Sequence, residues 1–161
     1  MEVSFKQDIN KSKEEKYKQF IEQYSLLIEG EKDEVSVLAN TSAALKETFN
    51  FFWVGFYMIK GNELILGPFQ GSVACYRIKK GRGVCGTAWT EEKTQIVPNV
   101  DLFPGHIACS SLSRSEIVVP ITSNGKIKGV LDIDSDELNT FDDTDRIYLE
   151  EIINILSSNI Y

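Results

Sequence analysis

Apolar residues recur at helical spacing in three stretches of the chain, and each stretch predicts an amphipathic helix. The three stripes consist of Tyr17, Phe20, Ile21, Tyr24, Leu27 and Ile28; of Val35, Leu38, Leu45 and Phe49; and of Tyr148, Ile152, Ile155 and Leu156. Gly30 is a suitable end for the first helix, Asp33 can cap the second, and Thr140 or Asp142 can cap the third. We expect these helices to pack against a core.

Between the second and third helices the apolar pattern changes to a period of two, which is typical of strands. The predicted elements there are strands at 52–58, 63–69 and 94–97, a short helix at 84–91, and a hairpin at 116–135. This order predicts one α+β domain over residues 1–161, with an antiparallel sheet and with residues 1–11 as a loose N-terminal segment. Two long loops remain, at 70–82 and 98–115, and long loops within a compact domain are usually functional or disordered. The apolar segment Ile107-Ala108-Cys109 favours a second loop that is ordered over a site.

Composition narrows the classes of function. The chain has 161 residues with 42% hydrophobic residues, which suits one packed core and excludes a disordered chain. Lysine and arginine number 17 against 24 acidic residues, so the net charge is −7, which argues against binding to nucleic acid or to an anionic membrane. The polar N-terminus shows no signal peptide, and no apolar run approaches a membrane span of about 20 residues. We therefore expect a cytoplasmic protein.

The hydrophobic pattern also selects a register for the last hairpin. A two-residue Asn-Gly turn would place apolar and acidic residues opposite each other. A three-residue turn at Ser123-Asn124-Gly125 pairs Ile117 with Leu131 and keeps the apolar side chains on one face. We expect this register, which sets Glu116 opposite Asp132 on the other face.

The same register gathers three carboxylates, because Asp134 lies two residues beyond Asp132 and shares a face with Glu116. A solvated outer face is the simplest interpretation. A packed cluster would instead hold a proton on one member at neutral pH, while its neighbours bind an ammonium group. Magnesium or calcium is a competing ligand, but no EF-hand spacing is present, so we rank a metal below a substrate and expect no metal site.

The three cysteines, Cys75, Cys85 and Cys109, have no zinc-site spacing and suggest no disulfide framework. They can be buried spectators or redox groups, and composition leaves both open. Cys75 and Cys109 lie in the two long loops, where thiols can approach within disulfide reach. Cys85 lies near a predicted helix start. His106 precedes Cys109 by three residues, but one histidine with no evident orienting partner is weak support for an activated thiolate.

Two further patterns have structural as well as functional interpretations. Trp53 and Tyr57 lie on one side of the first strand, as core packing or as an aromatic wall around a small apolar or cationic group. Residues 81–86 match the dinucleotide-binding pattern G-x-G-x-x-G. A predicted loop precedes them rather than a strand, so we interpret these glycines as loop and helix-start geometry.

Several long segments together resemble the free methionine (R)-sulfoxide reductases, which are single GAF-domain enzymes. The resemblance covers about residues 14–159 and rests on the segments NFFWVGFY (50–57), LGPFQG (66–71), GVCG (83–86), FPGHIAC (103–109), SEIVVP (115–120) and LDIDS (131–135). It implies a central antiparallel sheet with the N- and C-terminal helices on one face and active-site loops on the other. Ser110 is a departure, because many members have an acidic residue directly after the catalytic cysteine.

The resemblance also implies roles for single residues. Cys109 matches the catalytic cysteine, Cys75 the resolving cysteine that forms a disulfide with it, and Cys85 a third, auxiliary cysteine. The substrate-binding positions of the family are matched by Glu116, Asp132 and Asp134, with Trp53 and Tyr57 as the wall near the substrate methyl group.

The implied activity is reduction of free L-methionine (R)-sulfoxide, a defence against oxidative stress. Thioredoxin recharged by NADPH is the implied external reductant, no cofactor is bound, and the implied assembly is a homodimer. The rival hypothesis is a GAF-type sensor module that binds a small ligand or responds to redox state without catalysis.

Overall fold

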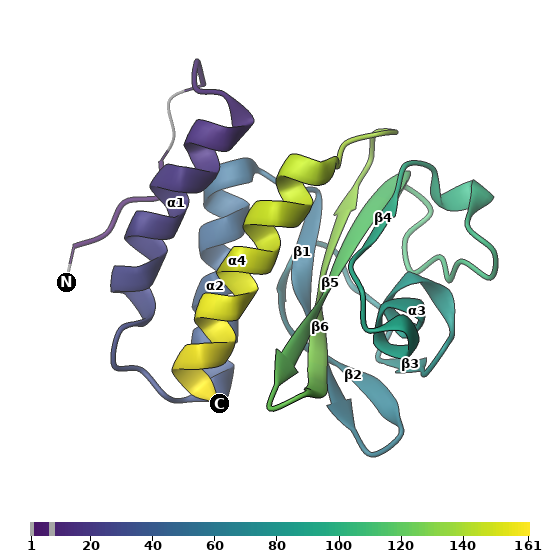
Figure 1. The fold of residues 1–161 in the computed structure, drawn as a ribbon. Helices are drawn as coiled ribbons and strands as arrows, with labels where there is room; N and C mark the ends of the chain where they lie inside the picture. Colours follow the sequence, from purple (N-terminus) through teal and green to yellow (C-terminus); the bar gives the residue numbers. More distant parts are fainter. Residues whose placement is uncertain (1, 7–8) are drawn as a thin grey trace.

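The computed structural model describes residues 2–6 and 9–161, and its centre is a six-stranded antiparallel sheet with strand order β3-β2-β1-β6-β5-β4 (Figure 1). The strands are β1 (Trp53–Lys60), β2 (Glu63–Gln70), β3 (Arg77–Lys79), β4 (Gln95–Val97), β5 (Ser115–Ser123) and β6 (Lys126–Ser135). The helices are α1 (Lys13–Ile28), α2 (Glu34–Phe49), α3 (Gly83–Glu91), the 3₁₀ turn η1 (Val100–Leu102) and α4 (Asp143–Ile160). The expected α+β architecture is confirmed.

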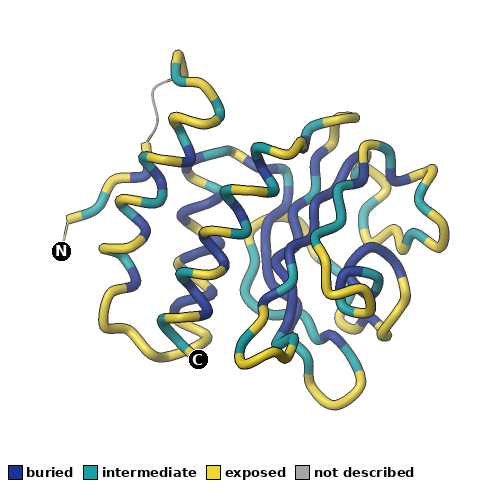
Figure 2. Tube along the Cα trace, viewed as in Figure 1, coloured by how far each residue is buried: buried dark blue, intermediate teal, exposed yellow. Residues whose placement is uncertain are grey.

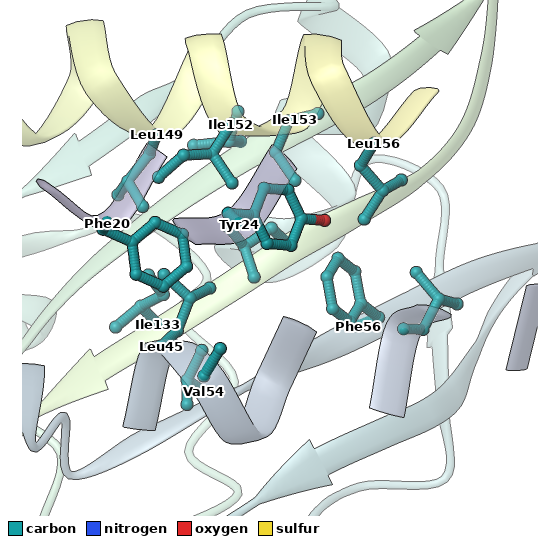
Figure 3. Close-up of a cluster of buried hydrophobic side chains, with 14 of the residues drawn as sticks. Phe20, Tyr24, Leu45, Val54, Phe56, Ile133, Leu149, Ile152, Ile153 and Leu156 are labelled. Atoms are coloured by element: carbon teal, nitrogen blue, oxygen red, sulfur yellow. The ribbon is translucent and has the colours of Figure 1, made fainter. Parts of the chain in front are cut away.

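The helices α2 and α4 cover one face of the sheet, and α1 packs on the outer side of these two helices (Figure 1). Asp33 caps α2 and Asp142 forms a reciprocal capping box with Asp145 at α4, as the sequence indicates, and Ser12, which was not predicted as a cap, caps α1. Figure 3 shows part of the apolar core between these helices and the sheet, and in Figure 2 the central strands are mostly buried while the helices alternate between buried and exposed positions. None of the helices in the described residues is long and apolar enough to cross a membrane.

The prediction that residues 1–11 form a loose N-terminal segment is wrong in part. Phe5 is buried and its ring lies 5.3 Å from that of Phe20, while its carbonyl accepts a hydrogen bond from Thr48. Burial of an aromatic side chain outweighs the entropy of a short polar segment. Residues 1, 7 and 8 lie outside the described residues.

The opposite face of the sheet carries α3 and the two long loops (Figure 1). A second, smaller apolar cluster lies there and includes Trp53, Tyr57, Val118 and Val130. Alternate side chains of the central strands therefore pack into two different layers, one on each face of the sheet, as the resemblance implies.

The register expected for the last hairpin is wrong by two residues, although both faces are as expected. Ile117 pairs with Ile133 rather than with Leu131, and Glu116 pairs with Asp134 rather than with Asp132. The turn is the two-residue one, with both Asn124 and Gly125 at positive φ, and a bulge between it and the core pairs absorbs the mismatch. Because a shift of two residues preserves the side of every side chain, all three carboxylates still share one face.

A short strand that we did not expect, β3, lies inside the first long loop and pairs with β2. The prediction that a loop, and not a strand, precedes residues 81–86 is therefore wrong. The rejection of a dinucleotide site stands because β3 is antiparallel to its neighbour and forms no βαβ unit. The glycines serve geometry: Gly81 and Gly83 have positive φ, and a Cβ on Gly86 would lie 2.6 Å from the carbonyl oxygen of Lys79.

Candidate active site

The three central strands bring the expected polar and aromatic residues to one pocket beneath the loops. Trp53 pairs with Asp134 and Gly55 with Asp132 across β1 and β6, and Glu116 lies opposite Asp134 on β5. The residues that line the pocket are Phe52, Trp53, Tyr57, Ser72, Val73, Ala74, Ile78, Arg82, Gly83, Val84, Cys85, His106, Ile107, Cys109, Ser110, Ser113, Glu116, Asp132 and Asp134. Seven of the eight expected site residues are among them, and the eighth, Cys75, is bonded to Cys109.

The carboxyl groups of Glu116, Asp132 and Asp134 repel one another in a site with little water. Burial, followed by the charge of Asp134, raises the pKa of Glu116 to about 8. Burial is also the largest cause that raises the pKa of Asp132, with Glu116 next, and of Asp134, with Asp132 next. The cluster therefore holds a proton at neutral pH and can donate it.

One oxygen of this cluster is unpaired. Asp132 is 6% exposed, and its Oδ1 has no hydrogen-bond partner among the described residues. A buried polar atom without a partner is costly, so such an atom in a pocket is suited to a donor from a ligand.

Cys85 lies in the first turn of α3 at the floor of the pocket, where it is 3% exposed and forms no disulfide. Burial, and then the charges of Asp132 and Glu116, raise the pKa of its thiol well above the usual value. The thiol thus stays protonated and is a poor nucleophile in this environment. The ligand atoms of Cys85, Glu116 and Asp132 lie within 4.8 Å of one another, a spacing that can also hold a metal ion.

The two loop cysteines form a disulfide. Cys75 and Cys109 are 34 residues apart, and their Cα atoms are separated by 5.5 Å. Cys109 is exposed and also lines the pocket, whereas Cys75 is half-buried. The bridge therefore closes the pocket on one side and faces solvent on the other.

The two aromatic residues of β1 do more than form a wall, because each also holds the loop that carries Cys75. The Trp53 indole N–H donates to the carbonyl of Ser72 at 3.0 Å, and the Tyr57 hydroxyl donates to the carbonyl of Cys75 at 2.9 Å. The Trp53 ring lies flat over β1, since a Cβ on Gly55 would come within 2.8 Å of it. Trp53 and Tyr57 therefore form the aromatic wall and also hold the loop of Cys75 by hydrogen bonds.

His106 does not form the Cys–His pair that its spacing suggested. Its Nε2 lies 3.7 Å from Oε2 of Glu116, and Cys109 is bonded to Cys75. Burial lowers the pKa of the imidazole, so His106 is neutral at pH 7 and adds no cation to the carboxyl cluster.

Arg82 was not predicted as part of the site, and the structure places it in the pocket. Ile107, in the segment expected to lie over a site, also lines the pocket, and a Cβ on Gly83, whose φ is +61°, would lie 3.2 Å from its side chain. The close approach of this loop to the start of α3 closes the pocket beside Cys109. For Arg82, which is exposed at the pocket mouth, no pattern in the sequence distinguishes it from other surface arginines.

Comparison with known proteins agrees with this geometry. Residues 31–160 match the family model of the GAF domain. A Dictyostelium discoideum protein named GAF domain-containing protein A is 60% identical over 91% of this chain and 94% of its own length. The free methionine-R-sulfoxide reductase of Escherichia coli is 44% identical over 88% of this chain and 87% of its own.

A solved structure is similar throughout. The free methionine-R-sulfoxide reductase from Neisseria meningitidis in complex with its substrate is 49% identical, with a TM-score of 0.93, and the alignment covers 98% of this chain and 94% of that one. The chain therefore belongs to the free methionine-R-sulfoxide reductases, a family built on the GAF domain.

Proposed function

We propose that this protein reduces free L-methionine (R)-sulfoxide to methionine with Cys109 as the nucleophile and Cys75 as the resolving cysteine. The observation that carries the proposal is the Cys75–Cys109 disulfide at the edge of a pocket whose floor holds buried, partly protonated carboxyls. Sulfoxide reduction needs these two functions together, a thiol and an acid.

The chemistry balances with these groups alone. The Cys109 sulfur attacks the sulfoxide sulfur while a carboxyl of the cluster protonates the oxygen, and this oxygen leaves on Cys109 as a sulfenic acid with release of methionine. The Cys75 thiol then displaces the oxygen as water and forms the disulfide. Two thiols and one sulfoxide thus give one disulfide, methionine and water, so no bound cofactor or metal is required.

The pocket explains selectivity for a free amino acid. Its acidic side chains, with the unpaired Oδ1 of Asp132, accept the ammonium group, and Trp53 and Tyr57 contact the methyl group. Backbone N–H groups in the 107–111 loop are the candidates for the substrate carboxylate. A methionine sulfoxide within a protein has neither a free ammonium nor a free carboxylate, so it is excluded.

The finer assignments extend this proposal. Thioredoxin, recharged by NADPH, reduces the bridge after each turnover in the cytoplasm, where thiols persist and disulfides are transient. The protein is a homodimer, for which the half-exposed Leu26 on α1 is the local support. Cys85 is auxiliary, since its raised pKa favours the thiol over the reactive thiolate.

Thiol titration tests the proposal directly. Fully reduced protein is mixed with stoichiometric free L-methionine (R)-sulfoxide without reductant, and free thiols are counted before and after. We expect the loss of two thiols for each methionine formed, and no loss with the (S) isomer or with a sulfoxide in a peptide. Unchanged thiols with bound ligand would instead support the rival hypothesis of a sensor module.

Two variants assign the roles of the cysteines. Cys109→Ser should abolish even a single turnover, because no thiol then reaches the sulfoxide. Cys75→Ser should keep one turnover and lose cycling with thioredoxin. Normal cycling of Cys75→Ser would show that another thiol, Cys85, resolves the sulfenic acid.

A further inference from the structure

Three large, exposed apolar side chains lie close along the chain to the cysteines of the Cys75–Cys109 bridge. Val73 is 88% exposed, Tyr76 is 80% exposed and Leu112 is 62% exposed, and all three lie within three residues of a bridge cysteine. Neighbouring Cα atoms are about 3.8 Å apart, so the Cα atom of each residue lies within about 11 Å of that of a bridge cysteine. Neither apolar core cluster contains any of the three, although Val73 also lines the pocket.

The charge around the bridge is opposite to that of the chain. The two loops, residues 70–82 and 98–115, contain five basic residues and one acidic residue, Asp101, in a chain whose net charge is −7. The five are Arg77, Lys79, Lys80, Arg82 and Arg114, and Arg77 forms an ion pair with Glu63. A zwitterionic amino acid has no net charge, so a positive field of this extent has little effect on its encounter with the pocket.

We propose that Val73, Tyr76 and Leu112, with the basic residues around them, form the docking surface for a negatively charged protein that carries a dithiol. We call this set the bridge rim. The inference rests on the proposed function, in which the bridge must be reduced after each turnover. An apolar centre with a charged border is the usual composition of a transient protein interface.

The chemistry of the encounter follows from the position of the bridge. A thiolate of the partner attacks one sulfur of the disulfide, and the other sulfur leaves as a thiolate and takes up a proton. The partner's second thiol then displaces the mixed disulfide, which releases the second cysteine of this chain as a thiol. Two electrons and two protons pass to this chain, and the partner leaves with a disulfide.

The docking surface borders the mouth of the substrate pocket, because Val73 and Arg82 also line that pocket. Substrate enters the pocket, whereas the reductant approaches the bridge from solvent, where Cys109 is exposed. Contact with the apolar rim holds a partner thiol near the bridge, and the basic border accelerates encounter with a negatively charged partner. A small neutral dithiol uses neither feature.

The test compares two reductants on the isolated oxidised protein. Stopped-flow measurements give the rate constant for reduction of the bridge by an acidic thioredoxin and by dithiothreitol. The charge variant is Lys79→Glu with Arg114→Glu, two exposed residues that do not line the pocket. We expect an approximately tenfold slower reaction with thioredoxin, a weaker dependence on salt, and an unchanged rate with dithiothreitol.

A matched control makes the same change in net charge at two positions that are distant in sequence from both bridge cysteines. Lys93→Glu with Lys126→Glu also reverses two exposed charges, and we expect it to leave both rates within twofold of the original protein. An apolar variant, Tyr76→Ser with Leu112→Ser, should slow thioredoxin about fivefold and spare dithiothreitol.

The bridge rim is refuted if thioredoxin reduces both rim variants at the original rate, or slows equally with the control. Because the reaction starts from the oxidised protein, this result is independent of methionine sulfoxide. Failure of the proposed function would be seen separately, as reduced protein that keeps its thiols in the presence of the sulfoxide.

Discussion

The two faces of the central sheet are made by the same strands and treat burial in opposite ways. Beneath α1, α2 and α4 the inward residues of β5 and β6 are apolar, as at Ile117, Ile121 and Ile133. On the other face the same strands bury Glu116 and Asp132. A buried apolar side chain stabilises the fold, whereas a buried carboxyl without full pairing destabilises it.

This difference indicates that the helical face stabilises the fold, whereas the pocket face lowers its stability. The helical layer has enough apolar burial to tolerate three crowded carboxyls and an unpaired oxygen on the opposite face. Groups with raised pKa values are frequent at functional sites for this reason, since the cost of burial is what prepares them to donate protons or bind a cation. If the two faces act independently, a change on the helical face should alter stability without altering activity, and a change on the pocket face should alter pH dependence or the redox reaction.

The largest expected effect on stability is on the helical face. Ile121 is fully buried there, near the turn of the hairpin and away from the pocket. Ile121→Ala should lower the free energy of unfolding by about 2–5 kcal/mol, through lost burial and a cavity. Urea unfolding measures the change, and below the midpoint the reduction of methionine sulfoxide should keep its rate. A loss of rate in fully folded protein would show that the two faces are coupled.

The pocket face should respond to pH instead. The folded pKa of Glu116 is about 8, well above the ordinary value of 4.5, so the folded protein binds more protons between these limits. Its stabilising contribution is therefore complete below about pH 4.5 and is lost as the pH rises through 8. Glu116→Gln should reduce this slope by the share of Glu116, since Asp132 and Asp134 also have raised pKa values, and should gain on the order of a few kcal/mol over the original protein above pH 8.

Thermal or urea unfolding across pH 4–9 makes this measurement. Glu47→Gln, at an exposed position of α2, is the matched control and should leave the slope unchanged. In the same range kcat/KM for methionine sulfoxide should fall as the pH rises through about 8 in the original protein, because the proton of the cluster is lost. Parallel stability curves for Glu116→Gln and the original protein would contradict the raised pKa.

Periodicity in the sequence was sufficient for the helical face. The apolar stripes of α1, α2 and α4 are local features, so these elements and most of their buried positions could be predicted. Val35, which the pattern placed on the apolar stripe of α2, is 64% exposed. The register of β5 and β6 could not be predicted, because the bulge depends on how the whole hairpin packs. The predicted register was wrong by two residues, and an even shift leaves every side chain on the predicted face of the sheet. The strand β3 has three residues, too few for a periodic signal.

The site divides in the same way. The carboxyl cluster follows from strand alternation together with the side that the hairpin pairing gives to each residue, whereas the roles of the cysteines came from resemblance to a family. The tether from Tyr57 to Cys75 joins residues 18 positions apart through one hydroxyl, and no pattern in the sequence specifies such a contact. The spacing of His106 from Cys109 gave only weak support for a Cys–His pair, and the imidazole lies near Glu116 because loop geometry decides which neighbour it contacts.

The smallest effect separates the two faces with a matched pair of hydroxyl deletions. Tyr57→Phe keeps the aromatic wall and removes the 2.9 Å hydrogen bond to the carbonyl of Cys75, whereas Tyr24→Phe removes the 2.7 Å bond to Thr41 in the helical layer. Each should cost about 1 kcal/mol in urea unfolding. Only Tyr57→Phe should slow closure of the disulfide after oxidation of Cys109, by about threefold to fivefold, because only that hydroxyl positions the Cys75 loop. Quenched-flow thiol counting measures this rate, and equal slowing in both variants would mean that loss of stability, rather than the tether, controls bridge formation.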